Sequence, residues 1–170
     1  ALRVGIAGLG TVGASVVRVL SHKGAELTRQ CGREITVTAV SARDRAKDRG
    51  IDLGGAEWFD DPVEMAKKAG IDVFVELIGG EEGAARAGVR AALDAGRHVV
   101  TANKALLSRH GVALAEVAEK KGVLLNYEAA VAGGIPVIKT MREALAGNSV
   151  SRVFGILNGT CNYILTRMEA

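Results

Sequence analysis

The sequence is poor in cysteine, proline and aromatic residues. Its 170 residues include two cysteines, two prolines and 4% aromatic side chains. Two cysteines cannot build a disulfide framework, so the composition favours a reducing, intracellular setting. The shortage of proline and aromatic residues excludes a proline-rich chain and argues against an aromatic-rich β-sandwich.

Long apolar runs and blocks of one charge are also missing. No apolar run approaches the length of about 18 residues that a membrane span needs, and the start does not resemble a signal peptide. We therefore expect a cytoplasmic protein without a membrane partner. The 22 Lys and Arg residues exceed the 19 Asp and Glu residues by only three, and they are spread along the chain. This mild charge favours a small anionic ligand over a nucleic acid.

Apolar residues and glycine are plentiful. Hydrophobic residues make up 48% of the chain, and there are 22 glycines. This composition excludes a disordered chain, and the length is slightly more than one ordinary domain needs.

Short apolar segments alternate with segments of helical periodicity. Strands are predicted over 2–7, 34–40, 71–78, 97–101 and 123–126. Helices are predicted from residue 12 to Gly24, which would end the helix in the left-handed conformation, and over 61–68, 81–95 and 104–121. This alternation predicts an α/β fold with a doubly wound, Rossmann-like parallel sheet.

The pattern changes after residue 130. A helix is predicted after Pro136, with a buried face made by Val137, Ile138, Met141 and Leu145. A strand over 150–157 and a last helix capped by Asn158-Gly159-Thr160 are expected to follow. We therefore divide the chain into a dinucleotide-binding domain, 1–130, and the start of a second α/β catalytic domain, 131–170.

A glycine-rich turn, Gly8-Leu9-Gly10-Thr11-Val12-Gly13, directly follows the first predicted strand. We expect Gly8 to permit the tight turn, Gly10 to let a pyrophosphate approach the backbone, and Gly13 to let the helix pack closely. Thr11 and Val12 would offer amides at the helix N-terminus. The alternative is a plain tight turn without a ligand.

The residues after the second predicted strand bear on the choice of dinucleotide. An NAD site usually has Asp or Glu at the strand end, where this chain has Ser41. Arg43, with Arg45 and Lys47 nearby, suits the 2′-phosphate of NADP. We therefore predict NADP in preference to NAD, although Asp44 could take the carboxylate role in a shifted register, and a solvated loop is the alternative.

Three further motifs carry a resemblance. They are Thr101-Ala102-Asn103-Lys104-Ala105, the segment from Tyr127 to Ile138, and the segment from Gly155 to Ile164. In this order behind the glycine turn, they resemble the homoserine dehydrogenase family over essentially the whole chain. The resemblance implies reversible interconversion of aspartate 4-semialdehyde and homoserine with NADPH or NADH, in threonine, methionine and isoleucine biosynthesis. It also implies a dimerising catalytic domain, and hence a homodimer of the whole enzyme.

The resemblance also implies site residues. Lys104, with Thr101 before it, would lie beside the nicotinamide and substrate, and Asn158, Gly159 and Thr160 would border the substrate. Sodium would be held largely by the backbone carbonyls of Glu128, Val131, Gly133 and Ile135. On the residues alone, Lys104 lies just beyond a strand end, where a lysine can exchange a proton with a hydroxyl or polarise an aldehyde. A surface lysine and a glycine loop that serves only its shape are the alternatives.

In the family, a second lysine and the carboxylates that hold the homoserine amine lie beyond the stretch matching this chain. We therefore expect an incomplete fragment that binds nucleotide but turns over homoserine poorly or not at all. One alternative is a phosphorylating semialdehyde dehydrogenase with Cys161 as nucleophile, although Cys161 is more simply a core thiol. No histidine is an obvious base, because His22, His98 and His110 are expected at surface or packing positions. The other alternative is a non-catalytic dinucleotide-binding sensor or regulatory module.

Overall fold

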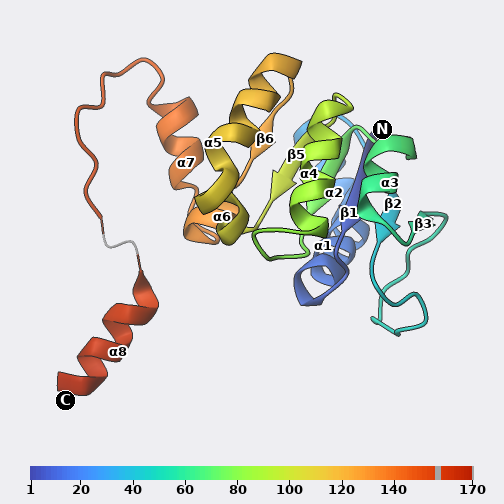
Figure 1. Cartoon of the computed structure of the whole chain (residues 1–170), viewed down its shortest axis with the longest axis horizontal. Helices are drawn as coiled ribbons and strands as arrows, with labels where there is room; N and C mark the ends of the chain where they lie inside the picture. Colours follow the sequence, from blue (N-terminus) through green and yellow to red (C-terminus); the bar gives the residue numbers. More distant parts are fainter. Residues whose placement is uncertain (156–157, 170) are drawn as a thin grey trace.

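The structure is a computed structural model that describes residues 1–155 and 158–169. Its centre is a six-stranded sheet in the order β3-β2-β1-β4-β5-β6, with every pair parallel (Figure 1). The strands are β1 (Leu2–Ala7), β2 (Ile35–Ser41), β3 (Glu57–Phe59), β4 (Val73–Glu76), β5 (His98–Thr101) and β6 (Leu125–Asn126). The order reverses between β1 and β4, where open α/β sheets bind ligands. The predicted doubly wound parallel sheet is confirmed.

Helices cover both faces of the sheet. The first face is covered by α1 (Thr11–His22), which is followed by α2 (Gly24–Cys31). The opposite face is covered by α3 (Pro62–Lys68), α4 (Ala84–Asp94) and α5 (Lys104–Lys121). No helix in the described part of the chain is both long and apolar enough to cross a membrane.

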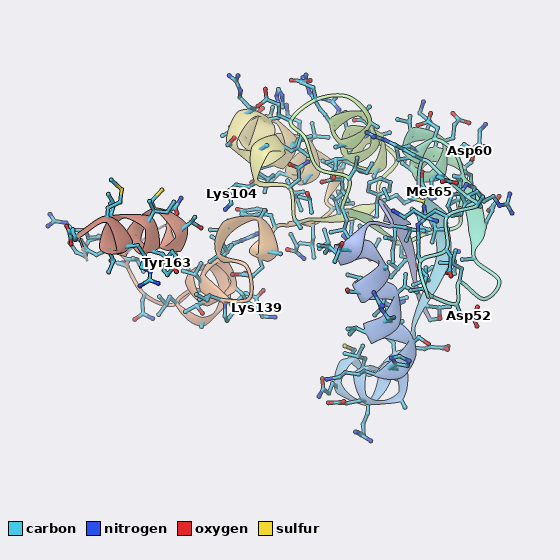
Figure 2. The ribbon with its side chains drawn as sticks, turned by 90° about the horizontal axis from the view of Figure 1, so that it is seen from below. Asp52, Asp60, Met65, Lys104, Lys139 and Tyr163 are labelled. Carbon is cyan, nitrogen blue, oxygen red and sulfur yellow. The ribbon has the colours of Figure 1, made fainter. Side chains whose placement is uncertain are left out.

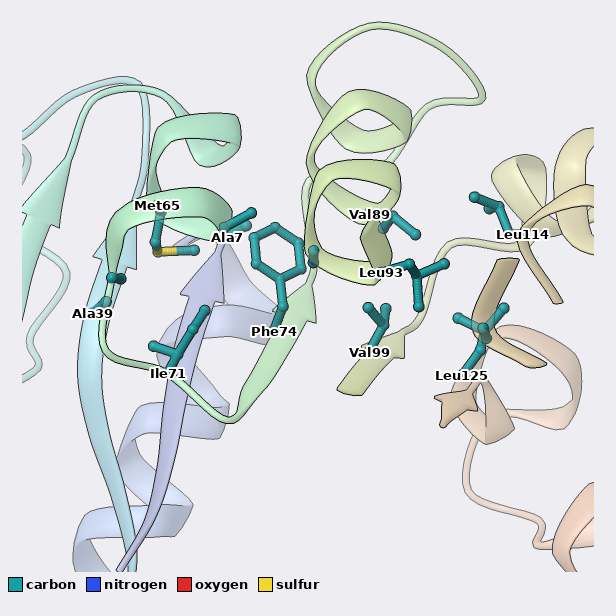
Figure 3. Close-up of a cluster of buried hydrophobic side chains, with 14 of the residues drawn as sticks. Ala7, Ala39, Met65, Ile71, Phe74, Val89, Leu93, Val99, Leu114 and Leu125 are labelled. Atoms are coloured by element: carbon teal, nitrogen blue, oxygen red, sulfur yellow. The ribbon is translucent and has the colours of Figure 1, made fainter. Parts of the chain in front are cut away.

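Successive side chains of a strand point to opposite faces of the sheet, so one strand contributes to the hydrophobic cores on both faces. In β4, the side chain of Phe74 joins the α3–α5 side, whereas Val73 and Val75 pack on the α1 side. Phe74 is fully buried and lies among the side chains of Met65, Val89 and other residues of the same cluster (Figure 3). A strand buried on both faces explains why its sequence is almost continuously apolar.

Several helix boundaries follow the predicted signals. Asp61 caps α3 through its side chain, which accepts a hydrogen bond from the Val63 amide at 2.9 Å. The prediction for Gly24 was wrong: α1 ends at His22, and Gly24 begins α2, which was not predicted. The left-handed glycine is Gly32, with a φ of 70° at the end of α2.

Two further differences concern short or exposed elements. Strand β3 was not predicted, because three residues at a sheet edge give almost no periodic signal. Helix α4 begins at Ala84, three residues later than expected, after Gly83 with a φ of 70°.

The segment after β6 is less regular than predicted. It contains α6 (Glu128–Ala132), α7 (Val137–Lys139), the π-helix η1 (Thr140–Ala144) and α8 (Gly159–Glu169). The predicted strand is wrong over 150–155, because no described segment pairs with it; residues 156–157 lie outside the described residues. The predicted buried face is partly exposed, with Met141 39% accessible. The helix α8 lies apart from the sheet (Figure 1).

Candidate functional site

The glycine turn after β1 is tightly built at two of its three glycines. Gly8 has a φ of +102°, and a Cβ atom there would come within 2.5 Å of the Leu77 carbonyl oxygen. A Cβ atom on Gly13 would lie 1.9 Å from the Gly8 carbonyl oxygen. A side chain at either position therefore conflicts with the backbone, as expected for a turn that brings the helix close to the strand.

Gly10 differs from its two neighbours because the space beside it is open. A Cβ atom on Gly10 would meet no atom within 4 Å, and its φ of −76° is allowed for any residue. Gly10 is the N-cap of α1, where no side chain caps the helix and the first turn holds no acidic residue. Thr11 and Val12 are exposed beside it. Helix amides and open space thus meet at the position predicted for a pyrophosphate.

The strand ends beside this turn form one continuous edge. The Gly8 amide donates to the Ser41 carbonyl at 2.8 Å, and the Leu77 amide donates to the Ala7 carbonyl at 2.7 Å. The ends of β2 and β4 therefore border the turn, one on each side. Arg43, two residues after β2, is exposed and enters none of the ion pairs of the described residues.

Asp44, the residue that could have replaced a missing ribose carboxylate, is used within its own loop. Its carboxylate accepts hydrogen bonds from the amides of Ala46 and Lys47, at 2.9 and 3.2 Å. This oxygen is therefore already engaged in shaping the loop. Arg43 is the first exposed charged residue after β2.

Arg49 is a residue that the sequence reasoning missed. Its Nε donates to the Leu9 carbonyl at 3.0 Å, and its other nitrogens donate to the carbonyls of Lys47 and Asp44. One guanidinium thus fastens the loop after β2 to the glycine turn. It also lies over the Trp58 ring, 5.7 Å from the centroid. Only a weak signal marked it, as one more basic residue in a basic stretch.

Lys104 lies where the sequence predicted, as the first residue of α5 after β5 (Figure 2). Asn103 caps the helix, because its side-chain oxygen accepts the Leu106 amide at 3.1 Å. The lysine is exposed and enters no ion pair among the described residues. A cation at a helix N-terminus opposes the helix dipole, so helix stability does not explain this lysine.

Glu76 is the second residue that the sequence reasoning missed. It ends β4 and is fully buried, and its carboxylate accepts hydrogen bonds from the amides of Ile78 and Gly79, at 2.8 and 3.0 Å. The Thr101 hydroxyl also donates to it, at 2.6 Å. Thr101 is 1% exposed, so its hydroxyl is engaged inside the protein, whereas a direct cofactor contact was expected. A charged residue at the carboxyl end of an apolar strand was the signal available.

The segment expected to hold sodium contains α6 and the residues that follow it. Glu128 begins α6, and its carboxylate accepts the amides of Ile138 and Lys139, both at 2.9 Å. The Ile135 carbonyl accepts the Val137 amide at 2.8 Å. Among the described residues, no hydrogen bond reaches the carbonyls of Val131 or Gly133 from outside α6. Sodium at the carbonyls of Glu128, Val131, Gly133 and Ile135 stays a prediction.

The structure does not bring Asn158, Gly159 and Thr160 to the glycine turn or to Lys104. Asn158 does cap α8 as predicted, since its side chain accepts the Cys161 amide at 3.0 Å. However, α8 lies apart from the sheet in both views (Figures 1 and 2). Their place at the substrate stays a prediction.

The cysteine alternative gains no support from the structure. Cys161 is exposed, so the expectation of a core thiol was wrong. No hydrogen bond links its thiol to a base in the described part of the chain. His98 accepts the Leu124 amide at 3.0 Å and His110 contacts Glu82 at 2.6 Å, as expected of packing and surface residues.

Comparison with known proteins agrees with this geometry. The model of the homoserine dehydrogenase NAD-binding domain matches residues 8–128, and the model of homoserine dehydrogenase matches residues 136–170. Homoserine dehydrogenase from Neisseria gonorrhoeae is 44% identical and that from Pseudomonas aeruginosa 46% identical, each over 168 residues. These matches cover 99% of this chain, which spans about 38% of the length of either relative.

Solved structures give the same result. A homoserine dehydrogenase from Thiobacillus denitrificans has a TM-score of 0.86 and 45% identity, over 98% of this chain and 38% of its own. A hyperthermophilic archaeal homoserine dehydrogenase in complex with NADPH has a TM-score of 0.80 and 25% identity, over 98% of this chain and 56% of its own. Family, fold and glycine turn agree, and the chain belongs to the homoserine dehydrogenase family, a family of oxidoreductases.

Proposed function

We propose that the glycine turn and the loop after β2 bind NADP, and that the chain is part of a homoserine dehydrogenase. Such an enzyme interconverts homoserine and aspartate 4-semialdehyde. The observation that carries the proposal is the open space at Gly10. It lies at an uncapped helix N-terminus, between two glycines that the backbone itself requires. A pyrophosphate would accept hydrogen bonds from the amides there and gain from the helix dipole.

The preference for NADP rests on the loop after β2. Arg43 is exposed two residues after the strand end, while one oxygen of the Asp44 carboxylate accepts hydrogen bonds from two backbone amides. A guanidinium suits a phosphate better than a ribose hydroxyl. The archaeal relative forms a complex with NADPH, which supports NADPH as a ligand of this site.

The chemistry can be assigned to the chain's own residues. When bound, the nicotinamide would supply or take up the hydride. Lys104 would bind the substrate oxygen: its ammonium stabilises negative charge on that oxygen and donates the proton when the aldehyde is reduced. In the opposite direction the lysine accepts the hydroxyl proton. Asn103 holds this lysine at the first position of α5 through its cap.

Several finer features belong to the same proposal. A domain boundary near residue 130 is supported by the two family models, which cover 8–128 and 136–170. Four features stay predictions: a homodimer, a cytoplasmic location, substrate contact by residues 158–160, and sodium at the carbonyls of Glu128, Val131, Gly133 and Ile135. The same holds for the pathway to threonine, methionine and isoleucine.

Equilibrium titration of the chain with NADPH and NADH tests the proposal. Arg43→Ala should weaken NADPH binding by about tenfold, the cost of one charge-assisted hydrogen bond, and leave NADH binding nearly unchanged. Arg29→Ala, at an exposed position in α2, is the matched control and should change neither. Equal affinities of the unaltered chain for NADPH and NADH would refute the preference, and no binding of either would refute the site.

A further inference from the structure

The buried carboxylate of Glu76 has no counter-ion, although burial of a charge is costly. It is fully buried, and no Lys, Arg or His forms an ion pair with it in the part of the chain that the structure describes. Its neighbours in the strand are apolar, and an apolar residue here would avoid the desolvation penalty. No ion pair therefore accounts for a carboxylate at this position, and its hydrogen bonds have to account for it.

The hydrogen bonds of Glu76 join two loops at the carboxyl edge of the sheet. One oxygen accepts from the amides of Ile78 and Gly79, in the loop after β4, and the other accepts from the Thr101 hydroxyl at 2.6 Å. Glu76 and Thr101 are direct partners across β4 and β5. The carboxylate thus fixes a loop on its own strand and a side chain on the next strand.

The network continues from Thr101 to the helix that carries Lys104. The Thr101 oxygen accepts the Asn103 amide at 3.0 Å, and the Asn103 side chain donates to the Gly80 carbonyl at 2.6 Å. Asn103 also caps α5. The loop after β4 and the start of α5 are therefore joined twice, through Glu76 and through Asn103.

The loop that Glu76 holds also borders the glycine turn. Gly79 and Gly80 both have a φ of +84°, with open space where a Cβ atom would lie. Leu77, one residue after Glu76, limits the space at Gly8, because its carbonyl oxygen would lie 2.5 Å from a Cβ atom there. A shift of this loop would change the turn on one side and the start of α5 on the other.

We propose that Glu76 is a positioning residue that holds the loop after β4 and the N-terminus of α5 in the arrangement that the dinucleotide site requires. This role rests on the proposed function, since it concerns the same site. Glu76 does not touch the ligand. It acts through the amides of Ile78 and Gly79 and through Thr101 and Asn103.

Substitutions that keep the shape test this role. Glu76→Gln keeps one acceptor oxygen but replaces the other oxygen by an amide nitrogen. That nitrogen cannot accept a hydrogen bond from the Thr101 hydroxyl. Thr101→Val removes that hydroxyl at constant shape, whereas Thr101→Ser retains it. Val89→Ala, in the buried core of α4, is the control for a loss of stability without a loss of this network.

The expected result separates positioning from stability. In NADPH titrations below the melting temperature, Glu76→Gln and Thr101→Val should each weaken binding by about tenfold. The double variant should be little weaker than either single one, because both break the same network. Thr101→Ser should bind like the unaltered chain, and so should Val89→Ala despite its lower melting temperature.

Amide hydrogen exchange gives a readout that does not depend on binding. Glu76→Gln should speed exchange at residues 78–80 and 103–106 and leave β1 unchanged. NADPH binding of Glu76→Gln equal to that of the unaltered chain would overturn the positioning role, as would an equal loss in Val89→Ala. If the unaltered chain does not bind NADPH, the proposed function fails. In that case amide exchange in Glu76→Gln tests the positioning role by itself. Faster exchange confined to residues 78–80 and 103–106 supports the role, while a uniform change or no change overturns it.

Discussion

Substitution of Gly13 by alanine tests how closely α1 approaches the turn after β1. The added Cβ atom would lie 1.9 Å from the Gly8 carbonyl oxygen, whereas real contacts essentially never fall below 3.0 Å. The helix and the turn must therefore separate by about 1 Å. Overpacking costs about 1–3 kcal/mol, and a contact this short lies at the upper end, near about 3 kcal/mol, while the better helix propensity of alanine returns about 1 kcal/mol. We expect a net loss of about 2 kcal/mol.

Urea and thermal unfolding measure this loss directly. In a chain of this size, about 2 kcal/mol lowers the melting temperature by about 4–8 °C. Gly111→Ala in α5 is the matched control, because its Cβ atom would meet the Leu107 side chain at an ordinary 3.7 Å. That variant should gain stability, by about 1 kcal/mol at most. Gly13→Ala with unchanged or increased stability would refute the close contact.

Gly10→Ala should leave the free energy of unfolding within about 0.5 kcal/mol of the unaltered chain, because the added Cβ atom would meet no protein atom within 4 Å. It should weaken NADPH binding, since the Cβ atom would occupy the space of the ligand, and unchanged binding would argue against the site. Phe74→Ala should cost about 3–5 kcal/mol in urea unfolding, since Phe74 is fully buried, and a loss below about 1 kcal/mol would contradict that packing. Hydrogen bonds from Arg3 hold the pKa of Asp72 well below its ordinary value, so the stability from this pair is present above about pH 4 and is lost as the pH falls. Asp72→Asn should therefore lower stability by about 1 kcal/mol near neutral pH and by less in acid, and a loss independent of pH would exclude the ion pair as its cause. Arg49→Lys should weaken NADPH binding several-fold, because a lysine cannot reproduce the three carbonyl contacts, whereas unchanged affinity would exclude Arg49 as the fastening of the loop.

The sheet and the glycine turn could be predicted from the sequence because both depend on residues close together in the chain. A strand buried on both faces is almost continuously apolar, and the glycines at 8 and 13 are required by the backbone between that strand and its helix. The helix predicted over 61–68 also has a local cause, because the Asp61 side chain caps α3 through a short-range hydrogen bond. The family resemblance added Lys104, which the structure places at the start of α5.

The residues that the sequence reasoning missed act over long separations in the chain. Arg49 bonds to Leu9, and Glu76 bonds to Thr101, and neither contact leaves a periodic pattern. The predicted strand near residue 150 failed for a related reason, since strand formation depends on a partner that the local sequence does not reveal. Helix α2 was missed because an expected stop at Gly24 is instead the start of the next helix.

The most direct test of the dinucleotide site is a map of backbone amide shifts during NADPH titration of the chain. We expect the largest shifts at residues 8–13 of the glycine turn, at 41–45 after β2 and at 78–80 after β4. Shifts in α2 should stay small, because α2 provides none of these contacts. Saturable shifts centred on α2 instead, or no shifts at residues 8–13, would exclude the glycine turn as the dinucleotide site.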